Sequence, residues 1–355
     1  MRATALEIPL VSPPGNLPGR TSSGLEEAML RALAYADVFD YPLSLEEIHR
    51  YLDGSQASKE ETLSILSSHR MRREVGRLQG FYALAGREKL AGTRLRRAQF
   101  CARLWPRALR YGRCIGRLPF VRLVAVTGGL AMNNVDSDGD VDIDYFVVTE
   151  PRRLWLCRLA VLALTKAASR FGFRLCANYF LSEQAMRVPE RNLYTAREIC
   201  QMVPVAGMET YGELRRLNAW TSDFLPNAAQ EPAIRFLDRR CAPAARSARG
   251  TWRASGAAPA ARGALKSLAE VIFRKRVFDP LEGWAMNRLS RKLVRLGHLT
   301  EAEARTTFTP DWQKSLRLGK YPAIMEAFHR RLDRLGLAQR GPERGRQNIP
   351  LPASS

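Results

Sequence analysis

The sequence lacks the residue patterns that define several common classes of protein. Its six cysteines are scattered without a C-x-x-C pair, and its four histidines show no zinc-finger spacing. The most apolar run, residues 154–164, is too short to span a bilayer and contains Arg158. The first twenty residues lack the apolar core of a signal peptide. These absences exclude a disulfide scaffold and a zinc finger, and predict a soluble, cytoplasmic protein without a transmembrane segment.

Acidic residues are scarce relative to basic ones. The chain has 56 Lys and Arg against 35 Asp and Glu, which gives a net charge of +21. Such an excess favours contact with nucleic acid, nucleotides or an anionic membrane. Arginine greatly outnumbers lysine, which is equally compatible with a compositional habit of the source genome. At 355 residues the chain is long enough for two or three domains with hydrophobic cores.

Residues 24–87 have the pattern of a winged helix, which is three short helices followed by a β-hairpin. Leu25 begins a helical spacing of apolar residues, and Ser44 with Glu47 forms a capping box for a second helix. A third helix is expected over residues 58–72, with Leu63, Ile65 and Leu66 in the core, and a hairpin turn near Gly80. The basic residues His69, Arg70, Arg72 and Arg73 could follow a phosphate backbone, although such domains also serve as packing or protein-interaction modules.

The only dense cluster of carboxylates in this basic chain lies in residues 121–150. An apolar strand (121–126) leads into Thr127-Gly128-Gly129, a short helical segment, an acidic loop and a second apolar strand. Five aspartates occupy every second position from 136 to 144. An EF-hand calcium loop would need Gly at its sixth and Glu at its twelfth position, and both requirements fail in every register.

The spacing of the last three aspartates favours a metal site on a strand. Asp140, Asp142 and Asp144 alternate with apolar residues, so a period of two places all three carboxylates on one face. They repel one another unless a cation lies among them, and two-metal phosphoryl transfer uses such an arrangement. A solvated acidic loop without an ion is the alternative. Gly128 and Gly129 would let backbone N–H groups approach phosphate oxygens closely.

This order of elements resembles the nucleotidyltransferase fold of DNA polymerase β and the CCA-adding enzymes. The family motif is Gly with Gly or Ser, about ten residues, and Asp-hydrophobic-Asp leading into an apolar strand. Gly128-Gly129 matches its first part and Asp142-Ile143-Asp144 its second, with Thr127 in place of a hydrophobic residue and Asp140 as an auxiliary ligand. Residues 25–227 look like a group of uncharacterised bacterial nucleotidyltransferase-domain proteins with an N-terminal winged helix.

The resemblance implies a reaction and its cofactor. The protein would transfer an NMP from an NTP, such as ATP, to a hydroxyl acceptor, with Mg²⁺ (or Mn²⁺) held by Asp142 and Asp144. The acceptor could be RNA, a protein or a small molecule. Thr127, Gly128 and Gly129 would bind the nucleotide, together with Lys166 on the following helix. Tyr179 and Tyr194 could stack on the base or belong to the core.

A third carboxylate is usual in the family and has no certain counterpart here. A strand expected over residues 173–183 carries Asn178 within its apolar run, and the nearest acids are Glu183 and, later, Glu198. Glu183 is therefore the predicted third metal ligand. Without such a ligand, the alternative function is a non-catalytic winged-helix regulator that senses nucleotide.

The expected fold class is α+β, with a mixed sheet flanked by helices. The segments predicted in chain order are a disordered leader (1–23), the winged helix (24–87), a basic helical connector (88–119), the nucleotidyltransferase-like domain (120–227), a linker (228–263), a basic helical region (264–338) and a disordered tail (339–355). The basic C-terminal helices also leave open a role on a membrane surface or as a scaffold.

Overall fold

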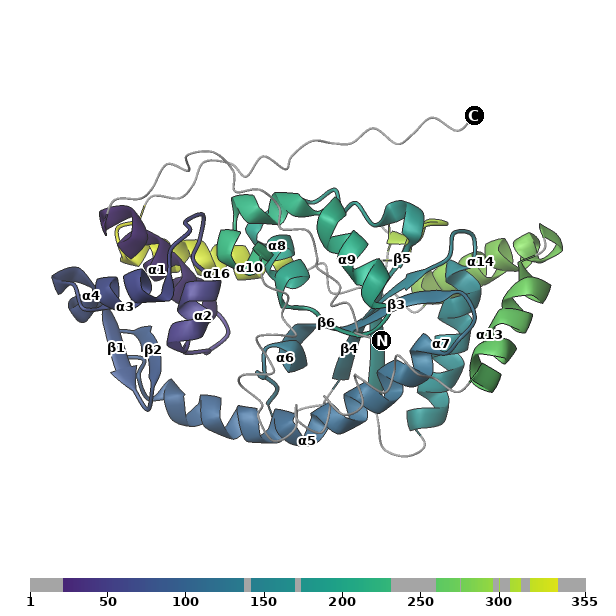
Figure 1. The fold of residues 1–355 in the computed structure, drawn as a ribbon, viewed down its shortest axis with the longest axis horizontal. Helices are drawn as coiled ribbons and strands as arrows, with labels where there is room; N and C mark the ends of the chain where they lie inside the picture. Colours follow the sequence, from purple (N-terminus) through teal and green to yellow (C-terminus); the bar gives the residue numbers. More distant parts are fainter. Residues whose placement is uncertain are drawn as a thin grey trace, which may run out of the picture.

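The computed structural model describes residues 22–136, 142–169, 174–230, 260–274, 276–295, 300, 307–313 and 320–337. The predicted leader, most of the linker and the predicted tail lie outside these ranges. The described chain is a mixed α+β structure with a five-stranded mixed sheet and a separate two-stranded hairpin (Figure 1). None of its helices is long and apolar enough to cross a bilayer.

The five-stranded sheet has the order β6-β3-β4-β5-β7. Its strands are β3 (Val121–Val126), β4 (Asp142–Thr149), β5 (Arg174–Ser182), β6 (Val203–Ala206) and β7 (Trp312–Gln313). Strand β4 is antiparallel to β3 but parallel to β5, because α7 (Leu154–Ser169) forms a crossover between them. The strands predicted at β3, β4 and β5 are confirmed. Strand β6, for which the sequence predicts no strand, lies at the edge of the sheet, where Pro204 is tolerated.

Both faces of the sheet are buried, and they belong to two different hydrophobic clusters. Phe146 and Val148 of β4 point into the cluster shared with the N-terminal helices. Tyr145 and Val147 point into the other cluster, which is formed with α7, α14 (Asp279–Arg295) and the long helix α5 (Leu90–Gly116). The alternation of β4 side chains therefore decides which residues face each layer.

The N-terminal helices precede a hairpin, as the sequence pattern predicts. The elements are α1 (Ser22–Asp37), α2 (Leu45–Arg50), α3 (Lys59–Leu66), α4 (His69–Glu74), β1 (Val75–Leu78) and β2 (Phe81–Leu84). The capping box of Ser44 and Glu47 is confirmed, as is the turn at Gly80. The single helix predicted over residues 58–72 is wrong, because Ser68 caps a new helix by accepting a hydrogen bond from the Met71 N–H. Leu63 is exposed rather than in the core.

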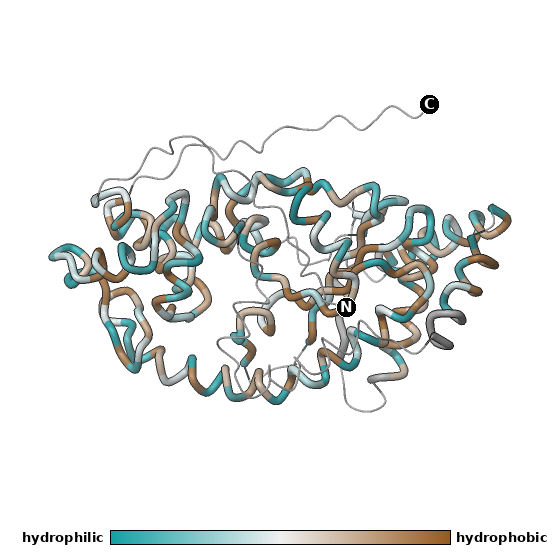
Figure 2. Tube along the Cα trace, viewed as in Figure 1, coloured by the Kyte–Doolittle hydropathy of each residue, from teal (hydrophilic) through white to brown (hydrophobic). Residues whose placement is uncertain are grey.

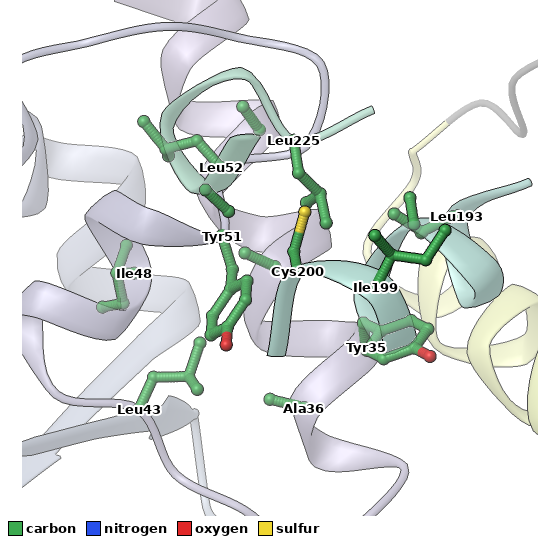
Figure 3. Packing of buried hydrophobic residues seen from close by; sticks show 14 of the residues in the cluster. Tyr35, Ala36, Leu43, Ile48, Tyr51, Leu52, Leu193, Ile199, Cys200 and Leu225 are labelled. Atoms are coloured by element: carbon green, nitrogen blue, oxygen red, sulfur yellow. The ribbon is translucent and has the colours of Figure 1, made fainter. Parts of the chain in front are cut away.

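Helix α1 is buried on almost every side, whereas its sequence predicts one apolar face. It is surrounded by the other N-terminal helices and by α16 (Lys320–Arg334), and it shares its core with α8 (Leu193–Gln201) and α10 (Pro226–Gln230). Figure 3 shows Tyr35 and Ala36 of α1 beside Ile199 and Cys200 of α8. One hydrophobic cluster thus extends from the N-terminal helices to the sheet.

Helix α5 connects the hairpin to the sheet and lies along one side of the molecule (Figure 1). Hydrophobic and hydrophilic residues alternate along it in Figure 2, as expected for a helix with one buried face. Helices α13 (Ala260–Phe273) and α14 lie at the end of the molecule opposite the N-terminal helices. The final helix α16 instead returns to α1, where Phe328 contacts Tyr35 edge to face.

Candidate functional site

The turn between β3 and α6 (Gly128–Ala131) holds the backbone directly against an aspartate of β4. Thr127 is extended, and its N–H donates to the Asp144 carbonyl oxygen at 3.0 Å. Gly128 has φ +64°, and a Cβ placed on it would lie 2.5 Å from Asp144 Oδ2. Both the left-handed backbone and the close carboxylate require glycine at this position. The structure therefore brings Thr127, Gly128, Gly129 and Asp144 together.

Asp142 and Asp144 lie on the same face of β4, and Ile143 between them is buried on the other face. Both aspartates are partly buried. Asp136 lies apart from them and forms an ion pair with Arg97 at 2.9 Å, while Asp140 lies outside the described residues. Within the described ranges, no three His, Cys, Asp or Glu side chains form a group that could hold a metal ion. Two adjacent carboxylates nevertheless fit Mg²⁺, which commonly takes one or two carboxylates and completes its shell with water and phosphate oxygens.

A pocket of about 500 Å³ opens beside this turn, between the sheet and three helices. The glycine turn and β4 contribute Gly128, Gly129 and Asp144 to its wall. Other lining residues come from α1, α8, α16 and the turn after α1, including Tyr35, Phe39, Tyr194, Glu198, Tyr321 and Ile324. A cavity of this size, apolar over much of its lining with a few acidic groups, has the character of a small-molecule site.

Aromatic rings form part of the pocket wall. Phe146 and Tyr179 stack on neighbouring strands with their centroids 5.4 Å apart and their planes at 15°. Tyr194 of α8 meets Tyr321 of α16 edge to face at 5.5 Å. Tyr179 and Tyr194, which the sequence leaves between base stacking and core packing, both line the pocket.

Glu198, the later of the two acids that follow the third predicted strand, is a candidate functional residue for which the sequence predicts no role. It lies on α8, lines the same pocket as Asp144, and accepts a hydrogen bond from Gln201 Nε2 at 2.6 Å. Burial raises the pKa of its carboxyl to about 7, and the negative charge of Asp144 contributes to the shift. A carboxyl that titrates near neutral pH can serve as a general base.

Glu183, the predicted third metal ligand, lies at the wrong end of its strand. Asp144 pairs with Cys176 in the parallel register of β4 and β5. Glu183 follows seven residues later, which is about 20 Å along a strand. There its carboxyl is near Arg122 and Glu150, and burial raises its pKa. The prediction that Glu183 joins Asp142 and Asp144 is therefore wrong.

Lys166 is not brought to the pocket either. It is exposed near the end of α7, and α7 packs on the face of the sheet opposite the pocket. A direct contact between Lys166 and a nucleotide in the pocket is therefore not supported. Asn178 falls where the register between β4 and β5 shifts, and its side chain lies outside the described parts of the chain.

One wall of the pocket is held in place by contacts between the N-terminal region and the loop after α6. The Tyr41 hydroxyl donates to the Met132 carbonyl oxygen, and Asn134 Nδ2 donates to the Phe39 carbonyl oxygen at 3.0 Å. Arg97 of α5 donates to Asn134 Oδ1 at 3.1 Å. These bonds connect the segment after α1, helix α5 and the loop after α6 at the same side of the pocket.

The basic residues predicted to follow a phosphate backbone lie away from the pocket. His69, Arg72 and Arg73 are exposed on α4, and Arg70 is partly exposed. Arg72 Nε donates to the Ser67 carbonyl oxygen at 2.8 Å. These basic residues therefore belong to the surface of the short helix α4, which leads into the hairpin.

Comparisons with known proteins found no matching family model and no significant match among curated proteins or solved structures. The site is therefore interpreted from its own geometry.

Proposed function

We propose that the protein is a metal-dependent nucleotidyltransferase, which transfers an NMP from an NTP to a hydroxyl acceptor. The observation that carries this proposal is the contact of the Asp144 carboxylate with the Gly128 backbone in a pocket that also contains Glu198. A phosphate-binding turn, a pair of carboxylates and a titratable acid are the groups that this reaction needs. The sheet order and the N-terminal helices with their hairpin are compatible with a nucleotidyltransferase domain preceded by a winged helix.

Each group in the pocket, and Asp142 beside it on β4, has a chemical role in this proposal. The Gly128-Gly129 backbone allows a phosphate to approach closely, and Asp142 and Asp144 would hold Mg²⁺ (or Mn²⁺). The ion, when bound, offsets the negative charge of the triphosphate. The acceptor hydroxyl loses its proton to the Glu198 carboxylate, its oxygen bonds to the α-phosphorus, and the bond to pyrophosphate breaks. Tyr179 and Tyr194 offer ring surfaces for the base.

A regulator that binds nucleotide without transferring it is the second candidate. It is favoured by the position of Glu183 at the far end of β5, which leaves Asp142 and Asp144 without the third ligand predicted from the sequence. The exposed arginines of α4 would then contact nucleic acid or another partner. For the enzyme, the candidate acceptors are RNA, a protein and a small molecule.

Transfer of label from α-labelled NTPs tests the enzyme directly. The purified chain is incubated with Mg²⁺, each NTP and total cell extract, beside Asp142→Ala, Asp144→Ala and the control Asp136→Ala. We expect the first two variants to lose transfer by roughly 10²–10³-fold, because metal binding provides several kcal/mol of charge stabilisation. Asp136, which is exposed and paired with Arg97, should be dispensable.

Two results would redirect the proposal. Equal labelling by the wild type and Asp144→Ala would exclude the site. Calorimetric binding of a Mg²⁺–NTP that depends on Asp144, with no transfer to any acceptor, would assign the protein to the regulators.

A further inference from the structure

Helix α13 contacts the rest of the protein through its polar residues. Lys266 Nζ donates to the carbonyl oxygens of Gly116 and Val121 at 3.1 and 2.8 Å. Glu270 accepts from the Phe120 N–H at 2.7 Å and from Arg122 Nη1 at 2.8 Å. The two residues are spaced by four, so they lie on one side of the helix, and that polar side faces the sheet region.

The apolar side of α13 and the corner that follows it point away from the protein. Seven of the twelve exposed large hydrophobic side chains in the described residues lie between positions 268 and 284, and they are 41–72% exposed. They are Leu268, Val271, Ile272, Phe273, Val277, Leu281 and Trp284. A helix on a globular protein normally buries its apolar face and exposes its polar one. Exposed apolar residues in such number are typical of interaction sites, and the described residues between 268 and 295 are called the α13–α14 corner.

The acidic residues of the α13–α14 corner are turned inward. Asp279 accepts from Arg153 Nη1 at 2.8 Å, beside Arg152. Glu282 accepts from the backbone N–H groups of Trp155 and Leu156 at 2.8 and 3.0 Å, at the start of α7. Together with Glu270, these are all the acids of α13 and α14.

The outward surface of the corner is therefore apolar and positively charged. Within the described part of this region, the exposed charged side chains are all basic: Arg274, Arg276, Arg288, Arg291, Lys292 and Arg295. Arg274 is held by Glu150 at 2.8 Å, and the others extend the basic surface along η3 (Arg276–Phe278) and α14. A second copy of the chain docked on this surface would bring like charges together, which disfavours self-association.

We propose that the α13–α14 corner binds the surface of an anionic lipid bilayer. The apolar side chains would enter the boundary between headgroups and acyl chains, with Trp284 at the level that tryptophan prefers. The arginines and Lys292 would contact the phosphate headgroups. The polar contacts of Lys266 and Glu270 fix α13 in the orientation that presents its apolar side. This inference does not depend on the activity proposed for the pocket.

Co-sedimentation of the full chain with lipid vesicles tests the proposal. We expect binding to vesicles that mix phosphatidylcholine with phosphatidylglycerol, and little binding to phosphatidylcholine alone. Val271→Glu should weaken binding by roughly tenfold or more, because it places a charge in the apolar surface. The matched control is Leu63→Glu, which alters an exposed aliphatic residue on α3 (49% exposed, against 62% for Val271) and should bind as the wild type does. Circular dichroism verifies that both variants are folded.

A second measurement reports insertion rather than electrostatic attraction. Lipids brominated on their acyl chains should quench the tryptophan fluorescence of the wild type, and most of this quenching should disappear in Trp284→Phe. Three results would overturn the proposal: no binding to anionic vesicles at low salt, equal binding by Val271→Glu and Leu63→Glu, or a dimer in solution that Val271→Glu dissociates while neither form binds vesicles. The last result would assign the surface to a second copy of the chain.

Discussion

The Glu198 carboxyl lies in the pocket where burial and the charge of Asp144 disfavour its ionised form, with a pKa of about 7. If it accepts the proton of the acceptor hydroxyl, the transfer rate should rise with pH up to about 7 and then level off, because only the ionised carboxyl is a base. Glu198→Gln should lower the rate by about 10²–10⁴-fold and remove this pH dependence. Measurement of single-turnover rates between about pH 5.5 and about pH 8.5, an interval that brackets the Glu198 pKa of about 7, checks both effects. An unchanged pH profile in the variant would exclude Glu198 as the base.

Glu198 should lower the stability of the fold at high pH, although its ionised form is the one needed for catalysis. The folded pKa lies above the unfolded one, so the unfolded chain releases the proton first as the pH rises, and ionisation favours unfolding. The cost is absent well below the unfolded pKa and reaches its full size above about pH 7. Glu198→Gln should therefore raise the free energy of unfolding at pH 8 and change it little at pH 4. Urea denaturation at the two pH values measures this difference, and a variant destabilised at pH 8 would contradict it.

Gly128 is a second position where a single residue decides the geometry of the site. Gly128→Ala forces a Cβ to within 2.5 Å of Asp144 Oδ2 and retains a left-handed backbone. We expect a loss of about 1–3 kcal/mol in the free energy of unfolding, together with a loss of nucleotide binding. Gly212→Ala is the matched control, because Gly212 lies within α9 (Met208–Leu217) with open space around its Cα. That variant should be neutral or stabilised by up to about 1 kcal/mol. Similar losses in both variants would show that the Asp144 contact is unimportant.

At the scale of elements, the junction of α2 and α5 depends on a buried ion pair. Arg94 and Glu47 are 1% and 0% exposed, with Nη2 3.1 Å from Oε1. The guanidinium also lies 3.5 Å from the centroid of the Tyr41 ring, and the Tyr41 hydroxyl oxygen is 2.7 Å from Glu47 Oε1. Because Tyr41 contacts the loop after α6, this pair also supports the wall of the pocket.

Arg94→Ala should be strongly destabilising, since it leaves the Glu47 charge buried without its partner. We expect a loss of about 3–5 kcal/mol in the free energy of unfolding. The control is Arg330→Ala, which removes an exposed pair with Glu326 on α16 and should cost less than about 1 kcal/mol. Chemical denaturation of the two variants compares them. Equal costs would mean that the buried pair contributes no more than a surface one.

The sequence predicts these elements well where their apolar periodicity is strong. Strand β3 has the predicted bounds, because six consecutive apolar or half-buried positions end at a glycine turn. The break between α3 and α4 was missed, because a serine that caps a new helix reads equally well as a helix interior. Strand β6 was missed because it is four residues long and contains Pro204.

The error at Glu183 has its physical origin in strand direction. A helix between β4 and β5 makes the two strands parallel, so the start of β5 lies beside Asp142 and its end, with Glu183, lies far away. That conclusion was available from the predicted helix. The position of Glu198 cannot be predicted in this way, because it depends on how α8 packs against the sheet and α1. Local sequence patterns do not report that packing.

At the scale of the whole molecule, a single hydrophobic cluster joins segments that are distant in sequence. It contains Met29 of α1, Phe146 of β4, Ile199 of α8 and Phe328 of α16. Arg50 of α2 also donates to the Cys200 carbonyl oxygen at 2.9 Å, which ties the N-terminal helices to α8. The N-terminal helices therefore complete the pocket and the core of the sheet, instead of standing apart from them.

This shared core predicts that the N-terminal helices and the sheet unfold in one transition, and that a ligand in the pocket stabilises both. Thermal unfolding followed by circular dichroism and by tryptophan fluorescence should give coincident curves. A Mg²⁺–NTP at about 100 times its Kd should add about 2.7 kcal/mol, which raises the Tm by roughly 5 °C. Asp144→Asn should abolish this shift while keeping a single transition. Two separate transitions would show that the N-terminal helices fold independently, and an equal shift in Asp144→Asn would place the nucleotide elsewhere.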